Sequence, residues 1–179
     1  RWGATVIAVD RDAEALAPVV EEMVRLGGRA EAAPADVCDE TAVAALFAGV
    51  AERHGRVDIL VNAVGGGKPA ALDEIGSAEW DRMFTFNAKS SFLCAREAAR
   101  SMRGGGRIIN VASLAGVASS VLQGAHYSSA KAAVIGLTRH LARELGPRGI
   151  TVNAIAPGTT LTERIRGQMT PQREADIAA

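Results

Sequence analysis

A tyrosine and a lysine that could form a proton-transfer pair lie four residues apart, at Tyr127 and Lys131. The surrounding residues have a helical pattern, and this spacing places both side chains on one face of a helix. Free tyrosine has a pKa of about 10, which is too high for a good base at neutral pH. A neighbouring ammonium group favours the phenolate, so such a pair can move a proton to or from an alcohol oxygen. Taken alone, the spacing also fits an ordinary solvent-exposed helix surface.

A serine hydroxyl is expected close to this pair. Ser113 lies two residues after an expected strand over Arg107–Val111. In an open parallel sheet, the binding crevice lies at the carboxyl ends of the strands. A hydroxyl at that edge could donate a hydrogen bond to a reacting oxygen and polarise a carbonyl group. Considered by itself, Ser113 is equally compatible with an ordinary turn.

Apolar, β-rich runs alternate with helical segments along the whole chain, which is typical of a parallel sheet with crossover helices. Strands are expected over Thr5–Val9, Arg29–Ala35, Val57–Asn62, Arg107–Val111 and Ile150–Ile155. Helices are expected from an N-cap at Asp12 to about Leu26, over Thr41–His54, from Ser77 to about Arg103, and over Tyr127–Leu145. This order predicts one α/β domain over residues 1–179, with a doubly wound, Rossmann-like parallel sheet in a three-layer αβα arrangement.

Both ends of this pattern are expected to be incomplete. A dinucleotide-binding sheet of this type normally starts with a strand and a glycine-rich turn, and no such turn precedes Thr5. The polar segment from Thr162 to Ala179 has a helical pattern with a break at Pro171, and it leads to no further strand. We therefore expect a piece of a longer protein in which the first strand, its turn and the last strand lie outside this sequence.

The composition favours a soluble cytoplasmic protein. Twenty Lys and Arg residues balance twenty Asp and Glu residues, so no net charge favours nucleic acid or an anionic membrane as a partner. No apolar run approaches the length of a membrane span. Cys38 and Cys94 have no CxxC spacing and are expected to be buried, reduced thiols. The three histidines lack metal-ligand spacing, so no metal site is expected; they are His54, His126 and His140.

Four stretches, in this order, resemble the short-chain dehydrogenase/reductase family, and the resemblance covers nearly the whole chain. They are DILVNAVG at Asp58–Gly65, NVAS at Asn110–Ser113, YSSAK at Tyr127–Lys131 and RGITVNAIAPG at Arg148–Gly158. The chain departs from the family pattern at Ala63 and Val64, where the family has asparagine and alanine. The family's glycine-rich turn is also absent, so no residue here can be assigned to the cofactor pyrophosphate.

The resemblance implies an NAD(P)-dependent oxidoreductase that interconverts a secondary alcohol and a ketone. It assigns Tyr127 as the general acid/base and Ser113 as the residue that polarises the substrate. Lys131 would also hold the nicotinamide ribose, and Asn87 would support a water-linked proton relay. The other cofactor contacts implied are Asp36 and Val37 at the adenine, Asn62 by the adenosine ribose, Pro157, Gly158 and Thr160 in the turn beside the nicotinamide, and Thr162 at the carboxamide.

An acidic residue at the end of the first strand, Asp10, indicates which cofactor is preferred. A carboxylate at this position can accept hydrogen bonds from the adenosine ribose hydroxyls and would repel a 2′-phosphate. Arg11 beside it could instead hold that phosphate. We therefore expect NAD, with NADP as the alternative.

Two other kinds of function are compatible with parts of the sequence. A non-catalytic, truncated relative with a structural or oligomeric role would explain the missing phosphate turn. A nucleic-acid-binding α/β domain is disfavoured by the zero net charge. Surplus apolar residues on the helices expected at Ser77–Arg103 and Tyr127–Leu145 predict a homo-oligomer, either a dimer or a tetramer.

The expected substrate is a small-molecule carbonyl compound or alcohol. The sequence does not distinguish between a 3-oxoacyl thioester, a sugar and a small ketone.

Gly65–Lys68 resembles a phosphate-binding loop but lacks its full spacing, and we interpret it as a flexible loop near the cofactor edge. Because His126 adjoins Tyr127, it could border the substrate pocket, but we interpret it as an ordinary loop histidine.

Overall fold

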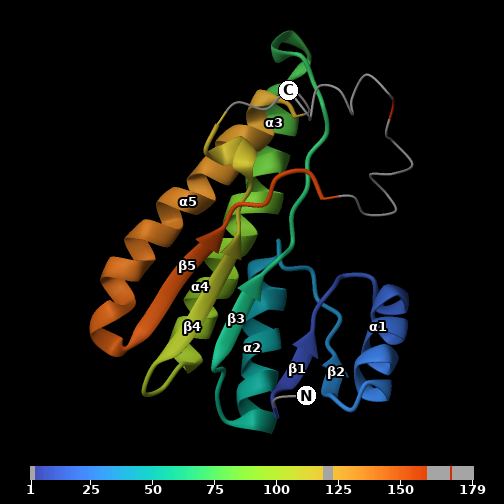
Figure 1. Ribbon diagram of the computed structural model, residues 1–179, viewed down its shortest axis with the longest axis vertical. Helices are drawn as coiled ribbons and strands as arrows, with labels where there is room; N and C mark the ends of the chain where they lie inside the picture. The colour runs from blue at the N-terminus through green and yellow to red at the C-terminus, as the bar shows by residue number, and fades with distance from the viewer. Residues whose placement is uncertain (1–2, 119–122, 161–169, 171–179) are drawn as a thin grey trace.

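Five parallel strands are formed by the described residues, which are 3–118, 123–160 and 170 of the computed structural model in Figure 1. The strands are β1 (Thr5–Ala8), β2 (Arg29–Ala32), β3 (Ile59–Asn62), β4 (Gly106–Val111) and β5 (Ile150–Ile155). The helices are α1 (Ala13–Arg25), α2 (Glu40–His54), α3 (Ser77–Phe84), α4 (Ser90–Ser101) and α5 (Ala125–Leu145). Short helical turns connect them at η1 (Leu72–Glu74), η2 (Thr85–Lys89), η3 (Leu114–Gly116) and η4 (Gly146–Arg148).

Aspartate caps fix the starts of the first two helices. The carboxylate of Asp12 accepts hydrogen bonds from the backbone N–H groups of Glu14 and Ala15, and Asp39 caps α2 in the same way. These bonds satisfy N–H groups that have no partner within the helix. The predicted helix start at Asp12 is therefore confirmed, and α2 begins one residue earlier than the sequence pattern indicated.

The long helix predicted from Ser77 to about Arg103 is interrupted. The helices α3 and α4 are joined by η2, a single π-helical turn over Thr85–Lys89. A π turn adds one residue to the helical repeat and often marks a functional position. The predicted strand over Arg29–Ala35 is also shorter than expected. It ends at Ala32, two residues before Pro34, which has no N–H group to donate to a ladder.

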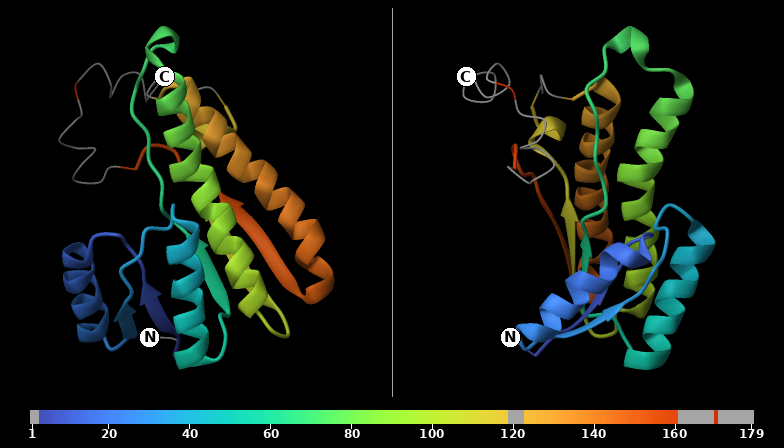
Figure 2. Two further views of the ribbon diagram at one scale, coloured as in Figure 1. Left: turned by 180° about the vertical axis from the view of Figure 1, so that it is seen from behind. Right: turned by 90° about the vertical axis from the view of Figure 1, so that its right-hand side faces the viewer.

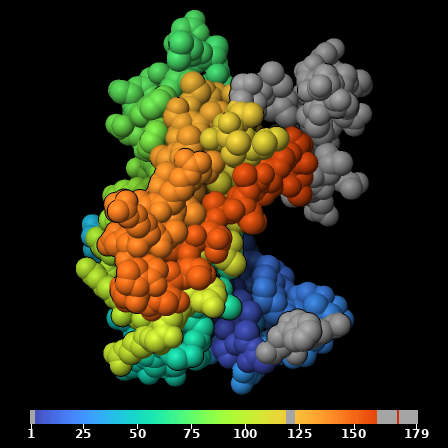
Figure 3. Space-filling model, turned by 60° about the vertical axis from the view of Figure 1, so that its left-hand side comes forward, coloured from blue at the N-terminus to red at the C-terminus, as the bar shows by residue number. Residues whose placement is uncertain are grey.

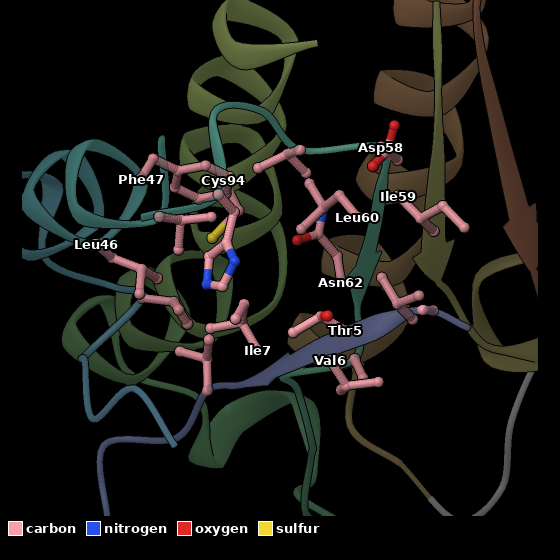
Figure 4. Close-up of a pocket in the computed structure, with 18 of the residues that line it drawn as sticks. Thr5, Val6, Ile7, Leu46, Phe47, Asp58, Ile59, Leu60, Asn62 and Cys94 are labelled. Carbon is pink, nitrogen blue, oxygen red and sulfur yellow. The ribbon is translucent and has the colours of Figure 1, made fainter. Parts of the chain in front are cut away.

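The strands form two hydrogen-bonded groups in the order β1-β2 and β3-β4-β5, and all pairs are parallel. A doubly wound sheet has one more strand between the positions of β1 and β3. Here an apolar cavity of about 660 Å³ separates these two strands (Figure 4). Its lining includes Thr5, Ile7, Phe47, Leu60, Asn62 and Cys94. The doubly wound, Rossmann-like parallel arrangement is confirmed, and it is partial.

Helices α2, α4 and α5 lie together on one face of the strands (Figure 2). The core lies between these helices and that face and includes Val43, Leu93, Ala98, Ile108, Ile150 and Val152. On the other face of the three-stranded sheet, Ile59 and Val61 are 58% and 54% exposed. The third layer of the predicted αβα arrangement therefore does not cover β3 within the described residues. The polar segment 162–179, predicted to be helical, lies outside the described residues apart from Thr170.

The two cysteines are free thiols, as expected, but they differ in burial. Burial raises the pKa of the Cys94 thiol to about 11. Cys38 is only half-buried, which corrects the expectation that both would be buried, and burial is the main cause that raises its pKa as well. In the described part of the chain, none of the helices combines the length and the apolar character that a membrane crossing requires.

Candidate active site

The carboxyl ends of the parallel strands bring most of the predicted site residues to one edge of the molecule. Asp10 follows β1, Asn62 ends β3, Ser113 follows β4 and Pro157 follows β5. In Figure 3, a hollow lies between the turn after β5, drawn in red, and the blue unit that contains β1 and α1. A crevice at this edge is where open α/β sheets bind ligands.

The loop that carries Ser113 is held on two sides. The Ser113 hydroxyl oxygen accepts a hydrogen bond of 3.2 Å from the backbone N–H of Ala115, which caps η3. The next residue, Leu114, donates its backbone N–H to the Pro157 carbonyl oxygen at 2.9 Å. The turn η3 also packs against α5. Ser113 is therefore fixed between the turn after β5 and the helix that carries Tyr127.

The Lys131 side chain passes through the interior to the end of β4. The residue is only 3% exposed, and its Nζ atom donates a hydrogen bond of 2.8 Å to the Val111 carbonyl oxygen. Burial disfavours the charged ammonium and lowers the pKa of Lys131 to about 8. The same Nζ atom lies 5.9 Å from the centroid of the Tyr127 ring. The predicted pair therefore lies together, and the lysine is anchored on a strand end.

The Tyr127 ring lies against the segment Gly65–Lys68. A Cβ atom at position 67 would be 2.5 Å from Cδ2 of the ring, so only glycine allows the backbone to approach this closely. The sequence interpretation of this segment as a flexible loop at the cofactor edge missed this contact. A glycine-rich pattern alone does not reveal which side chain the backbone will cover, because that contact depends on the tertiary packing of α5.

Asn87 holds the same segment through paired hydrogen bonds. Its side chain is fully buried in the π turn; Oδ1 accepts from the Gly66 N–H at 3.0 Å, and Nδ2 donates to the Gly66 carbonyl oxygen at 3.0 Å. Nδ2 also donates to the Met83 carbonyl oxygen at 3.0 Å. A Cβ atom at Gly65 would be within 2.8 Å of both Asn87 Oδ1 and Lys131 Nζ. Asn87, the glycine segment and the Tyr127–Lys131 pair thus form one cluster.

The predicted adenosine-side residues lie at the ends of β1, β2 and β3. Asp10 is exposed, and its Oδ1 atom accepts a hydrogen bond from the Asp12 N–H. Asp36 is exposed, while the neighbouring Val37 is buried. The side chain of Asn62 points into the interior, where its amide donates to the Asn110 side chain at 2.8 Å and to the Ser91 carbonyl oxygen.

The remaining predicted contacts follow β5. Pro157 is half-buried, and Gly158 and Thr160 are exposed. Thr162 lies outside the described residues. The described residues contain no group of three or more His, Cys, Asp or Glu side chains placed to hold a metal ion.

His126 is not a loop residue, which corrects the sequence interpretation. It is the second residue of α5, and it is fully buried next to Glu79 of α3. The helix begins two residues before Tyr127 because Gly124 provides an extended N-cap. The sequence contains no Ser, Thr, Asn or Asp at that position to mark the start, so the boundary was placed too late.

Comparison with known proteins relates the chain to a family of enzymes. The sequence matches the short chain dehydrogenase family over residues 1–173. It is 40% identical to a 3beta-hydroxysteroid dehydrogenase from Mediterraneibacter gnavus, over 99% of this chain and 65% of the relative. It is 37% identical to a 7alpha-hydroxysteroid dehydrogenase from Escherichia coli, over 96% of this chain and 68% of the relative. The chain spans about two thirds of the length of these curated relatives.

Solved structures give the same relationship. A short-chain dehydrogenase/reductase from Burkholderia xenovorans matches with a TM-score of 0.91 at 34% identity, over 97% of this chain and 69% of that one. A 7alpha-hydroxysteroid dehydrogenase in complex with NADH and 7-oxo glycochenodeoxycholic acid matches with a TM-score of 0.90 at 37% identity. That match covers 97% of this chain and 68% of the other.

The hydrogen bonds of Asn87 lead to a prediction about stability. In Asn87→Ala, the Gly66 N–H, the Gly66 carbonyl and the Met83 carbonyl lose their side-chain partners. We expect the free energy of unfolding of the full-length protein to fall by about 2–3 kcal/mol in urea denaturation. A fall of less than about 0.5 kcal/mol, which is typical of surface substitutions, would contradict the assigned role of Asn87.

Proposed function

Because the chain belongs to the short-chain dehydrogenase/reductase family, we propose that its protein is an NAD(P)-dependent oxidoreductase that interconverts a secondary alcohol and a ketone. Enzymes of this family act on CH–OH groups with NAD(P). One observation carries the proposal for this chain. The buried amine of Lys131 lies beside the Tyr127 ring, at the edge where β4 also presents Ser113.

In the proposed reaction, Tyr127 handles the proton. In alcohol oxidation, the Tyr127 phenolate oxygen takes the proton of the substrate hydroxyl, and the carbon that carries this hydroxyl releases a hydride. In ketone reduction, the phenol gives the proton back to the substrate oxygen. When bound, the nicotinamide cofactor supplies the hydride acceptor or donor. The Ser113 hydroxyl donates a hydrogen bond to the reacting oxygen. The Lys131 ammonium stabilises the negative charge on the Tyr127 oxygen.

The environment of Lys131 sets the pH range over which its positive charge can stabilise the Tyr127 phenolate. Its pKa of about 8 leaves the amine protonated at neutral pH, and the positive charge is lost as the pH rises through that value.

The backbone of Asn87 could take part in a water-linked proton relay. Its side-chain amide already donates to the carbonyl oxygens of Gly66 and Met83, so the relay would use its backbone carbonyl oxygen. That oxygen accepts one hydrogen bond of 3.1 Å from Ser91 Oγ. A carbonyl oxygen has two lone pairs and can accept a second hydrogen bond.

The described residues fit a dinucleotide at both ends. Tyr127 and Lys131 would hold the nicotinamide ribose, with Pro157, Gly158 and Thr160 alongside. At the other end, the buried Val37 offers an apolar contact for the adenine next to Asp36, and Asp10 exposes a carboxylate where the ribose would lie. Because the Asn62 amide is used in the interior, we propose that the backbone at this strand end faces the ribose. The exposed carboxylate of Asp10 supports NAD over NADP.

Substrate, assembly and location complete the proposal. Two relatives are hydroxysteroid dehydrogenases, so a panel of substrates should include steroid alcohols beside 3-oxoacyl thioesters, sugars and small ketones. A homo-oligomer, either a dimer or a tetramer, is proposed from the apolar residues that the sequence gives to α4 and α5, of which Phe92 is 43% exposed. We also propose a cytoplasmic location, in line with the balanced charge of the sequence.

The first prediction tests proton transfer. In the full-length enzyme, Tyr127→Phe removes only the phenolic hydroxyl, so turnover of the best alcohol in a panel should fall by about 10²–10⁴-fold. The dissociation constant for the cofactor, measured by fluorescence titration, should stay within about threefold of the wild-type value, because Lys131 still holds the nicotinamide ribose and one neutral hydrogen bond contributes little to affinity. Near-normal turnover would rule out Tyr127 as the acid/base. Lys131→Ala should weaken both turnover and cofactor binding.

The second prediction concerns cofactor choice. Asp10→Ala should weaken NAD binding by about tenfold or more and relax the rejection of NADP, because a hydrogen-bond acceptor and a repelling charge are both removed. Isothermal titration with each cofactor measures both effects. Asp58→Ala is the matched control, since Asp58 is an exposed aspartate just before β3, at the opposite edge of the sheet. If the wild-type protein already prefers NADP, then Arg11 rather than Asp10 determines the choice of cofactor, and the preference proposed here is wrong.

A further inference from the structure

A buried histidine with no role in the proposed reaction adjoins Tyr127. His126 is the second residue of α5 and has 0% exposure. Consecutive helical residues point about 100° apart, so His126 and Tyr127 face different neighbours. The Tyr127 ring lies against Gly67, whereas the His126 ring faces Glu79 of α3. Figure 1 shows α3 beside the N-terminal end of α5.

The Glu79 carboxylate is a fixed negative charge beside this histidine. It forms two hydrogen bonds of 2.8 Å with the Arg82 guanidinium, which are the main reason that its pKa is lowered to about 2. The Nζ atom of Lys68 is 3.6 Å from its Oε1 atom, and the Nε2 atom of His126 is 3.5 Å from the same oxygen. Glu79 thus joins α3, α5 and the end of the glycine segment.

The His126 ring is packed but not hydrogen-bonded. Neither ring nitrogen has a hydrogen-bond partner among the described residues, although Nε2 lies 3.5 Å from Oε1 of Glu79. A buried ring of this kind reduces stability compared with an apolar side chain of similar size. Its polar atoms are therefore not explained by packing. The neutral tautomer with its proton on Nε2, or the imidazolium, could donate to Glu79 after a small movement.

The position of the His126 ring is coupled to the segment that covers Tyr127. A Cβ atom at Gly124 would be 2.6 Å from Cε1 of the ring, so the backbone at the start of α5 rests directly on it. The Gly124 N–H donates to the Lys68 carbonyl oxygen at 3.3 Å. Lys68 follows Gly67, whose backbone lies on the Tyr127 ring. A shift of His126 would therefore move both the helix start and the cover of the tyrosine.

We propose that His126 is a positioning residue for Tyr127, acting through its contact with Glu79 and the segment Gly65–Lys68. The inference rests on the proposed function and deepens it. In the ligand complex His126 Nε2 donates to Glu79, because active-site hydrogen bonds that are long without a ligand commonly shorten when one binds. This contact then holds the tyrosine oxygen at the distance that proton transfer requires, and small misplacements of reacting groups are costly in rate.

The experiment compares two substitutions at position 126 in the full-length enzyme. His126→Gln keeps an N–H donor that reaches Glu79, and His126→Leu fills a similar volume with no donor. We expect His126→Leu to lower kcat by about ten- to a hundredfold, with KM and cofactor affinity within about threefold, and His126→Gln to retain kcat within about threefold. The melting temperature of each variant is measured, and kinetics are recorded well below the lowest value.

The chain offers a matched control on the same helix. His140 pairs with Glu144 at 3.3 Å on the exposed side of α5, and His140→Leu removes a His–Glu contact far from Tyr127. This variant should keep wild-type kcat. Combining His126→Leu with Glu79→Ala should lower kcat no further than the more harmful single change, because both remove the same contact.

The outcomes separate this inference from the proposed function. Loss of turnover in Tyr127→Phe, with equal kcat in His126→Leu and His140→Leu, would overturn the role of His126 and leave the function intact. Equal losses in His126→Leu and His126→Gln would also overturn it, because packing alone would then explain the effect. Retained turnover in Tyr127→Phe would overturn both proposals.

Discussion

The hydrogen bond from Lys131 Nζ to the Val111 carbonyl oxygen is the contact on which the candidate site depends. It joins the helix that carries Tyr127 to the strand end that leads to Ser113. An amine buried this deeply must have a partner, because a buried polar group without one is strongly unfavourable. Val111 is the last residue of β4, and its carbonyl oxygen therefore anchors α5 to the end of this strand. Without it, the spacing of Tyr127 and Lys131 would describe only a helix surface.

Around this anchor, the backbone is packed closely enough that side chains are excluded. The Gly65–Lys68 segment passes between Asn87, Lys131 and the Tyr127 ring, and it is held by paired hydrogen bonds to the Asn87 amide. The π turn presents Asn87 with its side chain fully buried beneath that segment. The fixed charge of Glu79 then joins α3 to the same segment through Lys68. Short glycine contacts and one buried amide therefore position a tyrosine that the proposal uses for proton transfer.

Local patterns in the sequence predicted the strands, their parallel order and the Tyr127–Lys131 pair, whereas Asn87 was implied only by the family resemblance. Unbroken apolar runs and aspartate caps act over a few residues, which is why β4, β5 and the start of α1 were placed well. The π turn at Thr85–Lys89, the buried position of His126 and the contact of Gly67 with Tyr127 were not predicted. Each depends on what lies across from the residue in three dimensions. The residues predicted at the adenosine side lie at the carboxyl-end edge of the strands, but the side chain of Asn62 points inward, where Asn110 and Ser91 provide its partners.

The state of the Lys131 amine can be measured directly by NMR. The printed sequence contains three lysines, and Lys68 and Lys89 are exposed, so they serve as references in full-length protein with ¹³C-labelled lysine. Burial penalises the charged form, so the Lys131 signal, identified by its loss in Lys131→Met, should titrate at about pH 8 against the ordinary value of 10.5. If Lys131 instead titrates at the ordinary value of 10.5, its amine is exposed to solvent. The anchor between α5 and β4, and the site built on it, would then be contradicted.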